Sequence, residues 1–138
     1  MNLGPKTVTV KHRDKLNKLT GWCAITALGN DFDEDAGGHL VLWDLKLVIR
    51  FPPGATILIP SALLYHSNAS LPDDQKRYSL TQYTSGDLLR WVANGFMNDN
   101  EFEETATAAE KRVRADVDAN RRDNNIKSFL PYSDLIKA

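Results

Sequence analysis

Three side chains that can bind a metal ion occur in two short segments of the sequence. His12 and Asp14 are two residues apart, and His66 ends the run Leu-Tyr-His. Residues i and i+2 of a β-strand point to the same face, so the imidazole and the carboxylate can be directed at one point. With His66 they would form a two-histidine, one-carboxylate triad, which suits iron(II) and leaves coordination positions open. Each signal is weak alone, because a His-x-Asp tripeptide occurs by chance and a single histidine on an apolar segment is more often structural.

An arginine follows at a spacing that fits a carboxylate-binding site. Arg77 lies 11 residues after His66, at the start of a predicted strand, with Ser79 on the same face. A guanidinium binds a carboxylate through two parallel hydrogen bonds and a hydroxyl adds another, so this pair could hold the distal carboxylate of 2-oxoglutarate. The alternative is a surface ion pair of Arg77 with Asp73 or Asp74. The metal triad upstream favours the first interpretation.

The elements that must position these side chains are mostly short strands. Between residues 6 and 84, runs of β-branched, aliphatic and aromatic residues alternate with glycine, proline and acidic clusters, which is typical of a β-domain. Residues 35–38 and 52–54 have the composition of turns between hairpin strands. The predicted strands cover residues 7–11, 22–28, 39–43, 46–51, 55–59, 63–66 and 77–83.

The pattern becomes helical after Tyr83. Ser85 is a candidate N-cap for a short helix that runs up to Gly95, and a second helix should begin near Asp99 and end within residues 120–125. This second helix has a narrow apolar stripe, which favours a largely exposed helix packed along one seam of the β-domain. We expect residues 1–84 to form the core and residues 85–138 to pack on it as part of a single structural unit. The stripe consists of Phe102, Ala106, Ala109, Val113 and Val117.

Composition limits the classes of protein to which the chain can belong. Its 138 residues, 42% of them hydrophobic and 25% charged, are typical of one globular domain. A formal net charge of -1 argues against binding nucleic acid or a membrane by bulk electrostatics. The single cysteine, Cys23, cannot form an internal disulfide, which favours a reducing intracellular compartment. No apolar run has the length that a bilayer span requires, so we expect no membrane contact.

Taken together, these segments resemble the double-stranded β-helix oxygenases, and more closely the TET/JBP family, which oxidises the methyl group of modified pyrimidine bases. Residues 12–17, His-Arg-Asp-Lys-Leu-Asn, resemble the family's His-Arg-Asp-x-x-Asn. Residues 54–66 resemble its last metal-ligand strand, and residues 77–80 resemble its cosubstrate strand. The resemblance covers about residues 7–84, and residues 37–43 and 90–92 are similar to the fungal branch.

The resemblance implies a mainly β fold with C-terminal helices, whose core is a double-stranded β-helix (jelly-roll, cupin-like). It also implies that iron(II), 2-oxoglutarate and dioxygen are used. His12, Asp14 and His66 would be the catalytic metal ligands. The cosubstrate would contact Arg77, Ser79 and His39.

The same resemblance implies a substrate site. Asn17 would hydrogen-bond the target base and Tyr83 would stack on it, as suits a base flipped out of a duplex. Alternatively, Asn17 caps the turn after the metal segment and Tyr83 is a core residue. The implied function is oxidation of 5-methylcytosine in DNA rather than RNA, which is a step in DNA demethylation, and the implied location is the nucleus.

Two departures from the family pattern affect this expectation. Ser85 stands where animal members have a second base-contacting histidine, so the choice of base could differ. The chain begins almost at the first ligand, so we expect the opening strand and an upstream cosubstrate arginine to be missing, and a partner segment or another chain to complete the open sheet edge. Two alternatives stay open: an oxygenase of the same fold acting on protein or a small molecule, and a truncated non-catalytic fragment that serves as a binding or structural module.

Overall fold

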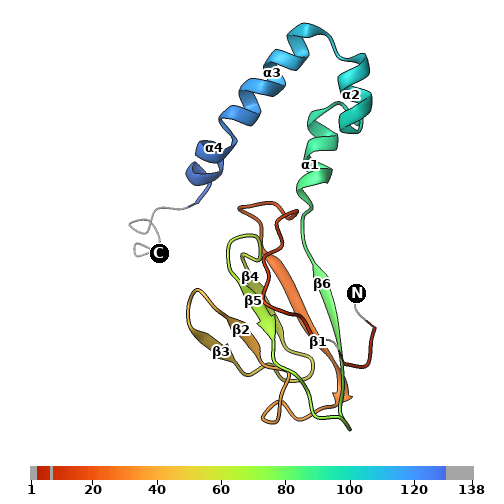
Figure 1. The fold of residues 1–138 in the computed structure, drawn as a ribbon, viewed down its shortest axis with the longest axis vertical. Helices are drawn as coiled ribbons and strands as arrows, with labels where there is room; N and C mark the ends of the chain where they lie inside the picture. The colour runs from red at the N-terminus through yellow and green to blue at the C-terminus, as the bar shows by residue number, and fades with distance from the viewer. Residues whose placement is uncertain (1–2, 7, 130–138) are drawn as a thin grey trace. The chain divides into compact units, whose positions relative to one another are not determined.

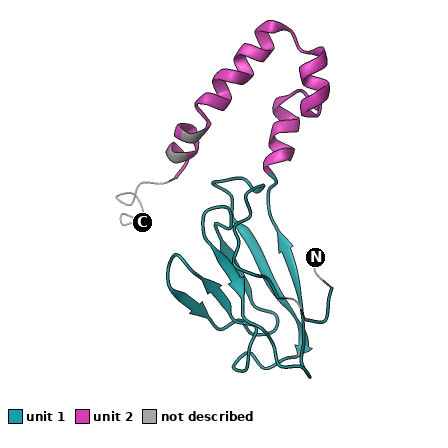
Figure 2. Cartoon of the chain, viewed as in Figure 1, with its two compact units in different colours: residues 1–85 teal, residues 86–138 magenta. Residues whose placement is uncertain are grey.

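The chain is divided into two compact units, residues 1–85 and residues 86–138 (Figure 2). The computed structural model describes residues 3–6 and 8–129. Within these ranges the first unit contains the strands and the second contains the helices. The division falls one residue after the predicted boundary at residue 84, and the packing of the helices on the core stays a prediction.

Two antiparallel sheets, each of three strands, make up the described part of the first unit (Figure 1). In the first sheet the long strand β1 pairs with β4 on one side and with β6 on the other. In the second sheet β2 lies between β3 and β5. The strands are β1 (Cys23–Asp31), β2 (Leu40–Leu42), β3 (Leu47–Ile49), β4 (Thr56–Ile59), β5 (His66–Asn68) and β6 (Lys76–Gln82).

One apolar core joins the inner faces of the two sheets. Alternate residues of β1 are buried, as expected for a strand with one face in a core, and the same holds for both ends of β2. Because buried residues of both sheets belong to one cluster, the sheets are held together by apolar packing. The cluster consists of Cys23, Ile25, Ala27, Phe32, Leu40, Leu42, Phe51, Ile59 and Leu71.

The segment predicted as the first strand, residues 7–11, is not a regular strand in its described part, residues 8–11. It follows a parallel bridge between Lys6 and β6, and it then runs beside β5, where the Thr9 carbonyl accepts a hydrogen bond from the Asn68 amide at 3.2 Å. An antiparallel bridge to β5 follows at His12. Because the chain pairs with β6 at Lys6 and with β5 at Thr9 and His12, it forms no continuous ladder with either sheet.

The strand predicted at residues 63–66 begins only at its last residue. The Pro60 carbonyl accepts hydrogen bonds from the amides of Leu63 at 2.9 Å and Leu64 at 3.1 Å, so the chain turns here. The prediction was wrong for the start of this strand, because the apolar composition of the turn is that of a strand. β5 begins at His66.

The helix predicted from Asp99 is interrupted. Ala106 is extended, and Thr107 caps a new helix through a capping box with Glu110. The helices of the described region are α1 (Gly86–Ala93), α2 (Asp99–Thr105), α3 (Ala108–Ala119) and α4 (Arg121–Lys127). No helix in that region has both the length and the apolar character needed to cross a membrane.

Candidate metal centre

Pairing between the N-terminal segment and β5 places two histidines side by side. The His12 amide donates to the His66 carbonyl at 3.0 Å, and the His66 amide donates to the His12 carbonyl at 2.9 Å. Directly opposed residues of an antiparallel pair have their side chains on one face. The two imidazole rings accordingly lie with their centroids 4.4 Å apart.

Asp14 completes a group of three potential ligands. It is two residues after His12, on the same face, and one oxygen of its carboxylate lies 3.4 Å from His12 Nε2. The other oxygen lies 3.9 Å from His66 Nε2. The ligand atoms of the three residues all lie within 4.8 Å of one another, so this group could hold a metal ion.

The second ring nitrogen of each histidine contacts the backbone. His12 Nδ1 lies 2.7 Å from the Val10 carbonyl oxygen, and His66 Nδ1 lies 2.9 Å from the Leu64 carbonyl oxygen. A carbonyl can only accept, so a neutral imidazole in either position has its proton on Nδ1 and its lone pair on Nε2. Such backbone contacts fix both the tautomer and the ring orientation of metal-binding histidines. The donor set therefore fits a divalent metal that accepts imidazole and carboxylate ligands.

The three side chains differ in exposure. The side chain of His66 is 6% exposed, that of Asp14 is 28% exposed and that of His12 is 37% exposed. The group is therefore closed at His66 and accessible at His12. This arrangement would allow small ligands to reach a bound metal from one side.

A hydrogen-bonded group of polar residues lies behind Asp14. The Asn17 amide nitrogen Nδ2 donates to Asp14 Oδ2 at 3.4 Å and to Ser61 Oγ at 3.1 Å. Burial raises the pKa of the Cys23 thiol, the hydrogen bond from Ser61 opposes this shift, and the nearby charge of Asp14 adds to it. No local sequence pattern marks Ser61, because it reaches Asp14 and Asn17 through pairing that is distant in the chain.

Arg77 and Ser79 lie on the buried face of β6, as their two-residue spacing predicts. Arg77 is 0% exposed and Ser79 is 7% exposed. The Arg77 guanidinium lies 5.3 Å from the centre of the Phe51 ring, and burial lowers the pKa of this guanidinium. The surface ion pair that Arg77 could have formed with Asp73 is made by Lys6 instead. Arg77 is thus a core arginine rather than a surface residue.

His39 follows a glycine that packs against Arg77. A Cβ atom at Gly38 would lie 3.2 Å from Arg77 Cδ, and Gly38 has a left-handed φ of +70°. The carbonyl of His39 accepts a hydrogen bond from the Ala69 amide at 2.9 Å. The backbone of His39 is therefore fixed beside Ala69, one residue after a glycine that contacts the Arg77 side chain.

The two predicted substrate residues lie near Ser85, the last residue of the first unit: Tyr83 in sequence and Asn17 by pairing. Asn17 forms an antiparallel bridge with Ser85, and its side chain is directed to the metal group as described above. Tyr83 follows the last residue of β6 and is 56% exposed, so it is not a core residue. Its ring is accessible for contact with another molecule.

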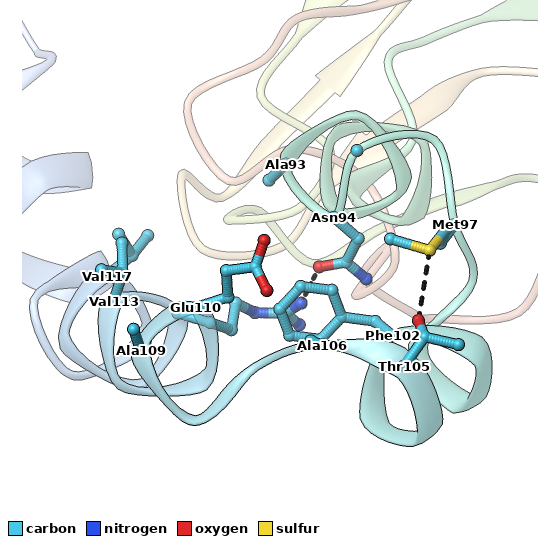
Figure 3. A pocket seen from close by; sticks show the side chains of 12 residues that line it. Ala93, Asn94, Met97, Phe102, Thr105, Ala106, Ala109, Glu110, Val113 and Val117 are labelled. Carbon is cyan, nitrogen blue, oxygen red and sulfur yellow. Dashed lines mark hydrogen bonds between the residues drawn. The ribbon is translucent and has the colours of Figure 1, made fainter.

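A separate pocket of about 540 Å³ lies within the helical unit (Figure 3). All five residues of the apolar stripe predicted for the second helix line it, from Phe102 to Val117. Arg114 is also part of the wall, and it hydrogen-bonds Asn94 and forms ion pairs with Asp99 and Asp118. The stripe lines a hollow between α1, α2 and α3 within the helical unit, and its packing along the β-domain stays a prediction.

The sequence matches no model of a known protein family, and no curated protein matches it. The likeness to the TET/JBP oxygenases therefore rests on the residues quoted above and stays a prediction.

Proposed function

We propose that the protein is an iron(II)- and 2-oxoglutarate-dependent dioxygenase that oxidises the methyl group of a modified base, with 5-methylcytosine in DNA as the expected substrate. The observation that supports this proposal most is the convergence of His12 Nε2, His66 Nε2 and the Asp14 carboxylate. When bound, iron(II) supplies the oxygen activation that couples methyl oxidation to conversion of 2-oxoglutarate into succinate and carbon dioxide. The double-stranded β-helix is the fold in which we propose that this occurs.

We assign roles in this reaction to five other residues. Arg77 and Ser79 would bind the distal carboxylate of 2-oxoglutarate from the inner face of β6, with His39 as a further contact. The exposed ring of Tyr83 would stack on a flipped base. Because Asn17 Nδ2 donates to Asp14 and Ser61, its carboxamide oxygen is the atom that would accept a hydrogen bond from a base amino group.

The first test is metal binding by the whole chain. Anaerobic titration with iron(II) should give one site per chain in the wild type and none in His12→Ala, because the variant removes one of three ligands. His39→Ala is the matched control, since it removes the histidine that we place outside the metal group. Absence of iron(II) binding by the wild type would reject the proposal.

The second test is turnover. Succinate production is measured with and without an oligonucleotide that contains 5-methylcytosine, and the bases are then analysed by mass spectrometry. Base oxidation that depends on His12, Asp14 and His66 would support the proposal. Succinate without base oxidation would reject the nucleic-acid substrate and favour an oxygenase acting on protein or a small molecule.

A further inference from the structure

Asp14 is the most easily displaced member of the metal group. The two histidines are fixed at Nδ1 by backbone carbonyls and by mutual backbone pairing. A carboxylate has no such second donor, and its terminal torsion is broad rather than confined to narrow wells. Something else must therefore hold the Asp14 carboxylate if it is to face both imidazoles.

The structure places an amide donor in that position. Asn17 Nδ2 lies 3.4 Å from Asp14 Oδ2, which is the carboxylate oxygen nearer to His66. An amide NH2 group has two protons, so Nδ2 can donate to Asp14 and to Ser61 Oγ, 3.1 Å away, at the same time. The amide thus connects the carboxylate to a second residue.

Ser61 is a firm anchor for this amide. It is 1% exposed, so its position is fixed by the surrounding packing. Its backbone carbonyl accepts a hydrogen bond from the Asp14 amide at 3.0 Å. The turn that contains Ser61 therefore holds the backbone of Asp14 directly and its side chain through Asn17.

We infer that Asn17, anchored by Ser61, is a positioning residue that orients the Asp14 carboxylate for metal binding. This inference rests on the proposed metal function and assigns Asn17 a role besides contact with a base. The alternative, that Asn17 only caps the turn, is served by its backbone amide, which donates to the Asp14 carbonyl at 3.0 Å and would persist in an alanine variant. The two roles can therefore be separated by removing the side chain alone.

The test measures metal affinity of the whole chain with manganese(II) and cobalt(II) as probes. Outer contacts to metal ligands are commonly worth about 10- to 100-fold in affinity, so Asn17→Ala should weaken binding by roughly that factor. Ser61→Ala, which removes one oxygen atom, should weaken binding in the same direction. The visible absorption of the cobalt(II) form should also change in both variants, because it reports the geometry of the ligands.

The double variant decides whether the two residues act together. If Ser61 acts through Asn17, removing both should weaken binding about as much as removing Asn17 alone, because contacts in one chain of hydrogen bonds are not additive. Thr26→Val, which deletes the 2.8 Å hydrogen bond between Thr26 and Thr56 in the same unit, is the control and should leave affinity unchanged. Thermal unfolding of each variant is measured alongside, and Ser61→Ala serves as the test if Asn17→Ala unfolds.

The outcomes are distinct. Metal affinity in Asn17→Ala equal to that of the wild type would overturn the inference while leaving the metal site intact. Additive losses in the double variant would overturn the anchoring by Ser61. If the wild type binds neither probe and His12→Ala behaves identically, the proposed function fails and the inference fails with it.

Discussion

Among the single residues, Arg77 combines a charged side chain with complete burial. A guanidinium in the core loses hydration, and this cost must be offset by hydrogen bonds or charge pairing. Under the proposed function Arg77 binds the distal carboxylate of 2-oxoglutarate. Arginine suits this role because its fork of donors matches a carboxylate, whereas a lysine presents a single point charge.

We therefore expect Arg77→Lys to raise the KM for 2-oxoglutarate with little change in metal affinity. The loss of one charge-assisted hydrogen bond, about 1.5–3 kcal/mol, corresponds to a change of about 10- to 160-fold. Steady-state succinate production at varied 2-oxoglutarate measures the effect. Arg50→Lys is the matched control, because Arg50 is an exposed arginine paired with Asp35. An unchanged KM in Arg77→Lys would remove Arg77 from the cosubstrate site.

The residues of the metal group could be predicted, and their supporting contacts could not. His12 and Asp14 were identified because a two-residue spacing has a local meaning in an extended chain. Ser61 was missed because its role depends on the turn after β4 lying beside the metal segment, which is a matter of tertiary pairing. A lone serine in an apolar run has no local pattern that would reveal such a contact.

Among the elements, α3 has a carboxylate in its first turn, that of Glu110, whose protonation should affect the stability of the helix. The Thr107 hydroxyl and amide hydrogen-bond Glu110, and these bonds lower the pKa of the Glu110 carboxyl from its ordinary value of 4.5. A lowered folded-state pKa means that the stabilisation is present above the unfolded value and is lost as the pH falls through the folded value. The start of α3 should therefore be weakened by acid.

We expect helical content, measured by circular dichroism at increasing temperature, to fall as the pH is lowered below the ordinary value of 4.5 and this carboxylate is protonated. The variant Glu110→Gln isolates the effect of this carboxyl. Glutamine can still complete a capping box but does not titrate, so the variant should show a smaller loss of stability in acid than the wild type. Identical acid sensitivity in the two proteins would contradict the prediction.

The same capping box is a local signal for the break between α2 and α3. Thr107 and Glu110 have the spacing of a helix start, yet the apolar stripe continues through them at helical intervals, which favours one uninterrupted helix. By contrast, no local signal marks residues 8–11 as irregular. Their pattern is that of a strand, but the chain leaves β6 after Lys6 and pairs with β5 at Thr9 and His12, so no continuous ladder forms.

At the scale of the whole molecule, the division into two units separates the proposed chemistry from the helical pocket. His12, Asp14 and His66 belong to residues 1–85, as do Asn17 and Ser61. The pocket is lined only by residues from Ala93 to Val117, which belong to the second unit. A substitution in the helical unit can therefore be tested for its effect on metal binding by the first unit.

Phe102 is the residue with which to make that comparison. It is the buried hydrophobic residue of the described helical region, 7% exposed, and its ring lies 5.7 Å from the Arg114 guanidinium. Phe102→Ala should destabilise the helices by about 3–5 kcal/mol, since a buried phenylalanine leaves a large cavity, whereas Val113→Ala at an exposed position of the same pocket should cost within about 0.5 kcal/mol. Circular dichroism at 222 nm and metal titration are measured on the same samples. We expect helical signal to be lost while metal affinity is retained, and a parallel loss of both would show instead that the chain folds as the single structural unit expected from its sequence.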